Sequence, residues 1–297
     1  MNVLPRLLGW QEASFTDYQR AYTAFGGSVL SDPRILHFIH QRFQLNERYF
    51  IRHNSAGELV GGVCIWDNQY IAGDQRIMRK HGINHYPLNC DEVALPISVN
   101  ARMILPFRTK FLSDLNHRSL LNSSHLLNAH REISIVRPVS AKTRSSRNRE
   151  LKRFQNAGGS VHSITEYDTE TLMHIYADLY YQRRGKRIGL ESTRDLLGEI
   201  PDLLFGSVLA FNEVPCAMQW VVKSEDCQRI YLDYVNAGMN LDLSYLSVGT
   251  LAAWVNIRAA EAYGEAQGKQ VRFSFGRPTM GYKDRWCIRE PLYRVTA

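Results

Sequence analysis

The sequence has few cysteines, and their spacing is irregular. Its 297 residues include five cysteines that form no CxxC pair: Cys64, Cys90, Cys216, Cys227 and Cys287. Such scattered positions are typical of unpaired thiols in a reducing compartment, and they do not form a set of zinc ligands. His37 and His40 lie three residues apart, but no third ligand accompanies them. We therefore expect neither a disulfide framework nor a bound metal.

The sequence also lacks a long uninterrupted apolar run. The first ten residues contain one arginine and no apolar core of signal-peptide length. Residues 203–222 carry a single charge over about the length of a bilayer span. However, Asn212, Glu213 and Pro215 lie at the centre of this run, and they are typical of a turn between two strands. We expect a buried hairpin there, and a cytoplasmic chain with no spanning helix.

Positive charge is concentrated in one segment. The formal net charge is +7, and residues 137–153 alone hold seven cationic side chains against Glu150. The pattern predicts a helix that ends at Gly158 and Gly159. This helix is either a solvated linker or a surface for anionic lipid or tRNA, and DNA fits it less well. Its candidate contact residues are Lys142, Arg144, Arg147, Arg149, Lys152 and Arg153.

Alternating strands and helices indicate an α/β fold. The N-terminal part predicts helices at residues 15–25 and from Asp32, a hairpin over 49–66, and strands at 92–98 and 132–136. We expect this part to cover residues 1–140, the basic connecting helix residues 141–159, and the C-terminal part residues 160–297. In the C-terminal part we expect strands at 160–164, 205–211, 215–223, 228–235 and 270–275. We expect helices at 169–184, at 192–197 (capped by Ser192 or Thr193) and at 248–263 (closed by Gly264). This order predicts a mixed sheet, antiparallel at first and parallel where the helix at 248–263 crosses over.

The segment after residue 246 carries the features of a known fold. A helical stretch from Ser247 is followed by Phe275-Gly276-Arg277, by the pair Tyr282-Lys283, and by Pro291-Leu292-Tyr293. This part resembles the end of the Fem-type peptidyltransferases and related GNAT proteins. The resemblance implies an α/β, GNAT-like mixed sheet flanked by helices. It also implies two tandem GNAT-type halves, in which the N-terminal half is degenerate and the C-terminal half is the acyltransferase half.

A narrower resemblance extends over the whole chain. The segment from Phe275 to Cys287, together with Asp32-Pro33 and Ile39-His40, is similar to the Mig-fourteen family of Gram-negative bacteria. This resemblance implies a GNAT-like fold, a role in resistance to cationic antimicrobial peptides under envelope stress, and a peripheral location on the inner membrane. The family has also been described as a transcriptional activator.

The donor-binding loop departs from the acetyl-CoA pattern. An ordinary GNAT loop reads Gln/Arg-x-x-Gly-x-Gly/Ala, and its amides hold a pyrophosphate at a helix N-terminus. Residues 242–250 keep Gly249 but lack the second glycine and the basic first position. Fem-type proteins also lack this loop and use an aminoacyl-tRNA donor. Both an acyl-CoA and an aminoacyl-tRNA donor therefore remain open, and the acceptor is undetermined.

Candidate site residues lie at strand ends. Tyr231 and Asp233 share one face of a strand, and Asp233 is a candidate general base if it is partly buried. The alternative is an Asp exposed at a strand end. The candidate substrate- or cofactor-binding residues are Arg277, Tyr282, Lys283, Gly249 and Thr250. The alternative for this group is structural, with Arg277 bridging loop carbonyls while Tyr282 and Trp286 pack a final helix.

Two hypotheses for function follow. The first is an acyl- or aminoacyltransferase that acts at the inner face of the cell envelope in antimicrobial-peptide resistance. The second is a non-catalytic GNAT-fold protein, either a membrane-associated interaction module or a DNA-binding activator, because a fold does not fix a function.

Overall fold

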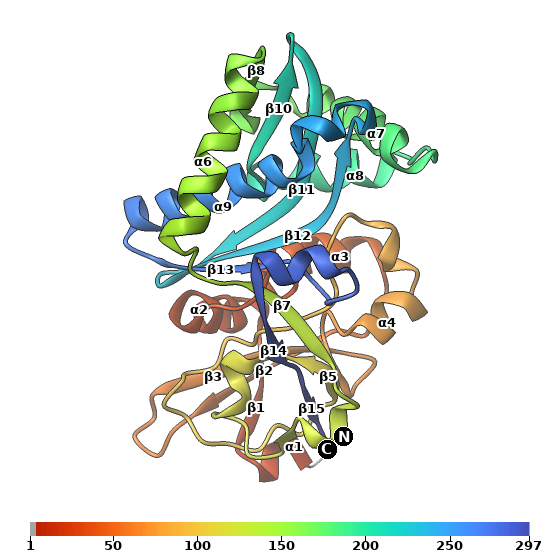
Figure 1. Ribbon diagram of the computed structural model, residues 1–297. Helices are drawn as coiled ribbons and strands as arrows, with labels where there is room; N and C mark the ends of the chain where they lie inside the picture. The colour runs from red at the N-terminus through yellow and green to blue at the C-terminus, as the bar shows by residue number, and fades with distance from the viewer. Residues whose placement is uncertain (1–3, 297) are drawn as a thin grey trace.

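The computed structural model describes residues 4–296, which form three β-sheets. An eight-stranded sheet builds the C-terminal part, and a four-stranded and a three-stranded sheet build the N-terminal part. The first and last described residues lie together at the end of the molecule farthest from β8 (Figure 1). Within the described residues, no helix has the length and apolar character needed to cross a membrane.

The eight-stranded sheet is antiparallel except for one pair. Only β12 and β13 run parallel, and helix α9 (Val248–Gln267) makes the crossover between them. Strand β13 lies in the interior of the sheet, between β12 and β7. In spatial order the strands are β14 (Cys287–Pro291), β7 (Glu132–Val136), β13 (Gln270–Ser274), β12 (Arg229–Met239), β11 (Val214–Glu225), β10 (Ser207–Phe211) and β8 (Gly159–Ser163), with β9 (Leu204–Phe205) paired to β11.

Helices cover both faces of this sheet. Helices α7 (Thr169–Arg184) and α8 (Glu191–Glu199) lie behind the sheet in Figure 1, while α6 (Ala141–Asn156) and α9 lie in front. Helix α9 buries Leu251, Trp254 and Ile257, as its sequence predicts. Burial of such side chains contributes roughly 1.5–3 kcal/mol each, so this face of α9 anchors it firmly to the sheet.

The chain order confirms the predicted fold class. After α6 the elements run β8, α7, α8, β9, β10, β11, β12, α9, β13 and β14, which is the predicted mixed α/β order with a parallel pair at the α9 crossover. Residues 203–222 form the predicted hairpin, and Asn212 and Glu213 at its turn both have positive φ. The predicted helix at 169–184 and the interior strand at 270–275 are also confirmed.

The N-terminal part holds the two smaller sheets. Their strands, in spatial order, are β1 (Trp10–Ala13), β2 (Arg48–His53), β3 (Leu59–Trp66) and β4 (Tyr70–Ile71), and then β5 (Thr109–Leu112), β15 (Tyr293–Val295) and β6 (Ser123–Ser124). The helices are α1 (Leu4–Leu7), α2 (Phe15–Phe25), α3 (Pro33–Arg42), α4 (Gln75–Lys80) and α5 (Asp114–His117). Residue 140, the predicted boundary, lies between β7 and α6. The two parts exchange strands across this boundary. Strand β7, which precedes residue 140, belongs to the eight-stranded sheet, and β15, from the end of the chain, belongs to a sheet of the N-terminal part.

Several predicted element limits are wrong. Residues 92–98 form no strand, only isolated bridges at Val93 and Ile97, because the Asn116 amide takes over the backbone hydrogen bonds of Leu95. Strand β13 ends at Ser274, one residue before its predicted limit. A short 3₁₀ turn, Gly281–Arg285, follows in the loop after it. Helix α8 begins at Glu191 without a side-chain cap, so neither Ser192 nor Thr193 caps it.

Helix α9 continues four residues past its predicted end. Gly264 does not close the helix, because its missing side chain makes room for β13: a Cβ there would lie 2.5 Å from Cγ2 of Val271. The helix ends instead at Gly268, which has φ +63°.

Candidate functional site

The two parallel strands separate at their carboxyl ends. Pairing between β12 and β13 stops at Asp233 and Ser274. Beyond that point β12 stays with β11, whereas the chain after β13 turns toward β7, where the amide of Phe275 donates to the carbonyl of Ser134. Ligands of open α/β sheets bind where neighbouring strands diverge in this way. Two hollows flank this opening.

The first hollow, which we call the α9 pocket, lies at the N-terminus of α9 and has a volume of about 310 Å³. Gly249 permits its shape, since a Cβ at this position would lie 2.8 Å from the terminal methyl of Met239. The first turn of α9 holds no acidic residue. The lining residues are Arg183, Gln219, Tyr234, Ala237, Met239, Ser244, Ser247, Val248, Gly249, Thr250, Ala253, Tyr282, Arg285 and Trp286.

The α9 pocket is electropositive. Its helix N-terminus contributes a partial positive charge and free amides. Arg183 donates to the carbonyl of Ala237 at 2.8 Å, which fixes its guanidinium at the wall, and Arg285 is exposed at the rim. Gln219 is only 3% exposed, and its side-chain oxygen accepts from Asn256 at 2.9 Å. These groups suit a phosphate-bearing ligand.

A tyrosine pair separates this pocket from the second hollow. The hydroxyl of Tyr282 donates to that of Tyr234 at 3.3 Å, and Tyr234 lines both hollows. Burial raises the pKa of Tyr282 above its ordinary value, with a further contribution from Tyr234. At neutral pH Tyr282 is therefore an uncharged phenol whose hydroxyl can donate a hydrogen bond.

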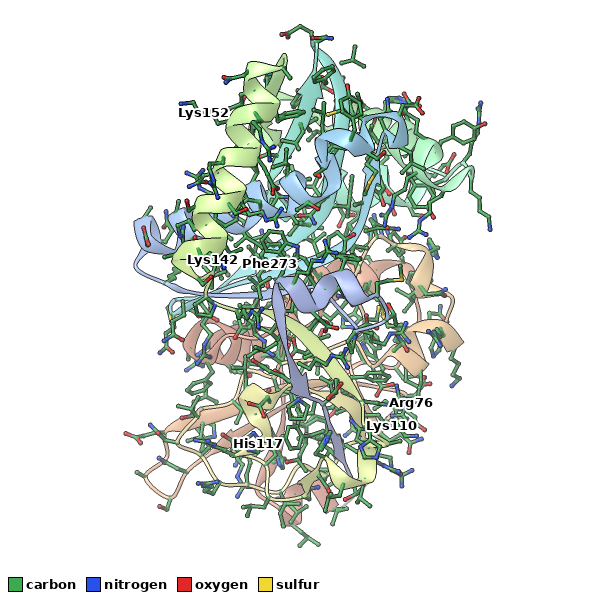
Figure 2. The ribbon with its side chains drawn as sticks, viewed as in Figure 1. Arg76, Lys110, His117, Lys142, Lys152 and Phe273 are labelled. Carbon is green, nitrogen blue, oxygen red and sulfur yellow. The ribbon has the colours of Figure 1, made fainter. Side chains whose placement is uncertain are left out.

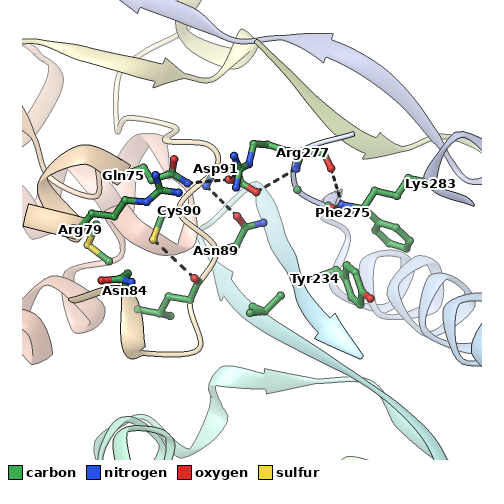
Figure 3. Close-up of a pocket in the computed structure, with 14 residues that line it drawn as sticks. Gln75, Arg79, Asn84, Asn89, Cys90, Asp91, Tyr234, Phe275, Arg277 and Lys283 are labelled. Atoms are coloured by element: carbon green, nitrogen blue, oxygen red, sulfur yellow. Dashed lines mark hydrogen bonds and ion pairs between the residues drawn. The ribbon is translucent and has the colours of Figure 1, made fainter. Parts of the chain in front are cut away.

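The second hollow, the interface pocket, lies between residues 75–91 of the N-terminal part and residues 275–283 of the C-terminal part (Figure 3). Its volume is also about 310 Å³. Its walls are mainly polar, and Gln75, Arg79, Asn84, Asn89, Asp91 and Arg277 are among them. Burial raises the pKa of the Cys90 thiol at this wall to about 12, so the thiol is not a reactive nucleophile at neutral pH.

Arg277 and Lys283 both reach the interface pocket, but each already has protein partners. Nε of Arg277 lies 2.8 Å from Oδ1 of Asp91, and the Arg277 amide donates to Oδ2 of Asp91 at 3.2 Å. Lys283 donates to the carbonyls of Phe275 and Arg277, each at 2.6 Å (Figure 3). Lys283, and not Arg277, bridges the loop carbonyls. The two cations thus fix the loop after β13 and tie it to the N-terminal part.

Tyr231 and Asp233 share a face of β12, as their alternation predicts, but this face lies outside both pocket linings. The neighbouring Arg272 is held by Glu92 and by Glu290, the latter at 2.9 Å. Asp233 is buried at 8% exposure instead of exposed at a strand end. Burial raises its pKa well above the ordinary value, and the carboxylates of Glu92 and Asp91 add to the effect. Its predicted role as a general base stays a prediction.

The cations of α6 divide into two groups. Arg144 pairs with Glu261 at 3.0 Å and lies over the Trp254 ring, while Arg147 pairs with Glu150 and lies over the Trp286 ring. Arg144 thus packs α6 onto α9, and Arg147 packs α6 against Trp286. The remaining four are exposed, and Figure 2 shows Lys142 and Lys152 along the helix: Lys142, Arg149, Lys152 and Arg153.

The structure thus brings Tyr282, Gly249 and Thr250 together in the α9 pocket and places Arg277 and Lys283 in the interface pocket. Sequence reasoning missed Tyr234, Arg183, Gln219, Met239 and Arg285 as pocket residues. Tyr234 had a usable signal, because it alternates with Asp233 and so faces the side of the sheet that carries α9. Arg183 and Gln219 had none, since only the packing of α7 and β11 brings them to the pocket.

The two helical histidines have protein partners. The ring of His40 is held by Tyr49 at 2.9 Å and by Trp66 at 2.7 Å, and that of His37 contacts Gln41 at 2.8 Å. Within residues 4–296 no cluster of three histidine, cysteine or carboxylate ligands is placed to hold a metal ion.

Solved structures similar to this one include a synthetase domain, an L-PGS structure and a tandem GNAT protein. The C-terminal domain of a putative lysylphosphatidylglycerol synthetase from Agrobacterium fabrum is 10% identical, with a TM-score of 0.46, over 95% of this chain and 92% of that one. The L-PGS structure from Bacillus licheniformis is 13% identical, with a TM-score of 0.45, over 96% and 92%. A tandem GNAT protein from the clavulanic acid biosynthesis pathway is 9% identical, with a TM-score of 0.40, over 96% and 97%.

The family is established by sequence. No curated protein matches the chain. The model of the Mig-14 family, however, matches residues 32–295 and so covers nearly all of the two parts, including β12, α9 and the loop after β13. The chain belongs to the Mig-14 family.

Proposed function

We propose that this protein is an acyl- or aminoacyltransferase whose donor binds in the α9 pocket and whose acceptor enters through the interface pocket. The observation that carries the proposal is that the two hollows meet at Tyr234, at the opening between β12 and β13. An electropositive pocket on one side and a polar pocket on the other suit a reaction between two different substrates. The predicted GNAT-like fold supports the same class of reaction.

The residues at the opening have distinct roles in this proposal. The amides at the start of α9 and the guanidinium of Arg285 bind the phosphate of the donor, which places its acyl carbon beside the tyrosine pair. An amine or hydroxyl of the acceptor attacks that carbon, and the bond to the donor's sulfur or oxygen breaks. Tyr282 keeps its proton at neutral pH and donates it to the leaving sulfur or oxygen, while the proton that the attacking amine or hydroxyl loses passes to Tyr282 and restores the phenol. Both acyl-CoA and aminoacyl-tRNA carry the required phosphate.

The proposed setting is the inner face of the cell envelope, in resistance to cationic antimicrobial peptides. Membership of the Mig-14 family supports this role. The four exposed cations of α6 support peripheral contact with an anionic lipid surface or with tRNA, because near an anionic leaflet each Lys or Arg contributes about 1 kcal/mol.

The donor site can be tested by ligand titration of the purified protein. Trp286 lines the α9 pocket and stacks on Trp254, so donor binding should change tryptophan fluorescence. We expect acetyl-CoA or aminoacylated tRNA to bind, and Arg285→Gln to weaken binding roughly tenfold through the loss of one charge-assisted contact. The matched control is Arg184→Gln, which removes an exposed arginine outside the pocket. Equal binding by both variants, or no binding by the parent, would contradict the proposal.

Transfer chemistry is tested separately from binding. Tyr282→Phe keeps the ring and removes only the hydroxyl, so donor binding should persist. Survival of the bacterium under a cationic peptide should fall to that of a strain without the protein, since general acid catalysis typically contributes about 10²–10⁴-fold. Full resistance with this variant would remove Tyr282 from the mechanism.

One observation favours the non-catalytic alternative. In the described part of the chain, neither a carboxylate nor a histidine lines the α9 pocket, and Asp233 lies outside it. An interaction module or a DNA-binding activator on a GNAT-like fold would need no general base. Donor binding without any transfer, combined with full resistance for Tyr282→Phe, would support this second candidate.

A further inference from the structure

A third hollow lies in the N-terminal part, apart from the two pockets at the sheet opening. It has a volume of about 340 Å³, and β4, α4, β5 and β15 contribute to it. We call it the cationic pocket. Figure 2 shows two of its residues, Arg76 and Lys110, close to each other and well below the labelled lysines of α6. Its lining residues are Tyr70, Arg76, Arg108, Thr109, Lys110, Arg294, Val295 and Thr296.

One guanidinium in this pocket is held in place by a buried carboxylate. Asp74 caps α4 and is fully buried at 0% exposure. It accepts from Nε and Nη2 of Arg76, each at 2.9 Å, and from the backbone amide of Lys110 at 3.4 Å. The Arg76 guanidinium also lies 5.1 Å from the centre of the Tyr70 ring. Arg76 is therefore preorganised, and one carboxylate links it to strand β5.

Three further cations converge on the same hollow from two strands. Arg108 and Lys110 are two residues apart, so they project from the same side of the strand. Arg294 comes from β15, whose Val295 is paired with Thr109 of β5. No carboxylate of the described chain lines the pocket, and the described residues provide no salt bridge to Arg108, Lys110 or Arg294. Asp74 neutralises only Arg76, so the other three like charges repel one another, and a bound anion relieves this repulsion.

We propose that the cationic pocket binds a phosphate ester. Arg guanidinium groups form paired hydrogen bonds with phosphate, and lysine adds a point charge. The phosphate can belong to the headgroup of an anionic phospholipid or to a soluble molecule. This site is independent of the proposed transferase function, because none of its residues lines the α9 pocket or the interface pocket.

Exposed leucines favour the lipid as the source of the phosphate. Strand β6 pairs with the other edge of β15, and the segment around it carries Leu121, Leu126 and Leu127. All three are exposed, and Leu126 reaches 93% exposure. Cations beside exposed apolar side chains are typical of proteins that bind a membrane surface peripherally.

The test compares two variants that lose the same charge. The pocket variant replaces Arg108, Lys110 and Arg294 with Gln. The control replaces Arg184, Lys186 and Arg187, an exposed cluster between α7 and α8, with Gln. Each is mixed with vesicles of phosphatidylglycerol and phosphatidylcholine, with vesicles of phosphatidylcholine alone, and with soluble glycerol phosphate. Sedimentation measures vesicle binding, and calorimetry measures soluble binding.

We expect the parent and the control to bind the anionic vesicles, and the pocket variant to bind them about tenfold to a hundredfold more weakly. Glycerol phosphate bound by the parent and not by the pocket variant would support the same site with a soluble ligand. Equal behaviour of all three proteins in both arms would overturn the proposal. If the triple variant fails to fold, Arg108→Gln alone gives the same comparison, because this side chain is exposed and its removal leaves the Asp74–Arg76 contact intact.

Discussion

Replacing Lys283 with Met should destabilise the fold by about 1–3 kcal/mol. Lys283 is 8% exposed and donates to the carbonyls of Phe275 and Arg277, each at 2.6 Å. Methionine preserves much of the side-chain volume but leaves two carbonyls without their donor. That of Phe275 is buried, at a cost of about 1–3 kcal/mol, whereas the contact to the Arg277 carbonyl is only partly buried and contributes less. Burial lowers the pKa of Lys283, so removal of the buried ammonium offsets part of this loss. The remaining loss is a large fraction of the roughly 5–15 kcal/mol by which such a protein is stable.

Urea unfolding, followed by tryptophan fluorescence, measures this effect. The control is Lys152→Met, a lysine exposed on α6, which should change the unfolding free energy by less than about 0.5 kcal/mol. A loss below about 1 kcal/mol for Lys283→Met would refute the reasoning. If Lys283→Met lost little stability but failed to bind the donor, Lys283 would be a ligand-binding residue, as the sequence analysis predicts.

Two further predictions concern buried and exposed charge. Burial and the nearby carboxylates raise the pKa of Asp233, so its ionisation opposes folding at neutral pH. Asp233→Asn should therefore raise the melting temperature at pH 7. This gain should disappear below about pH 4, where the carboxyl is protonated in the unfolded chain as well. A lower melting temperature at pH 7 would contradict this. Replacing the four exposed cations of α6 with Gln should weaken binding to anionic vesicles or tRNA at low salt without changing the melting temperature. The double variant Arg144→Gln and Arg147→Gln should instead lower the melting temperature. Unchanged binding by the first variant would show that α6 is only a linker. The first set is Lys142, Arg149, Lys152 and Arg153.

The fold could be predicted largely because its signals are local. Apolar periodicity placed α7 at its observed limits, and a turn composition at Asn212 and Glu213 identified the hairpin. The errors arose where distant residues decide the backbone. A glycine such as Gly264 usually marks the end of a helix, but here it lies inside α9 because the close approach of Val271 leaves no room for a side chain. Residues 92–98 look like a strand, but the Asn116 side chain replaces a partner strand.

The candidate site was harder to predict, because its chemistry depends on which partners each charge meets. The sequence places Arg277 and Lys283 after a buried strand, and such a position fits both a ligand site and a structural role. Only the tertiary structure shows that Asp91, from the other part of the chain, pairs with Arg277. In the same way, residues 137–153 have a concentrated positive charge, but only the packing on α9 shows which cations are exposed.

The loop after β13 explains how residues that do not contact the donor can still control its site. Lys283 fixes the carbonyls of the loop, and Arg277 fixes the loop to Asp91. The adjacent Tyr282 and the nearby Arg285 extend from this loop into the α9 pocket. A loop with those anchors holds the phenol near Tyr234, so under the proposed mechanism we expect substitution of Arg277 or Lys283 to reduce transfer by displacing Tyr282. Loss of resistance in such variants therefore counts as evidence for phosphate binding only when the Tyr282–Tyr234 contact and the stability of the fold are unchanged.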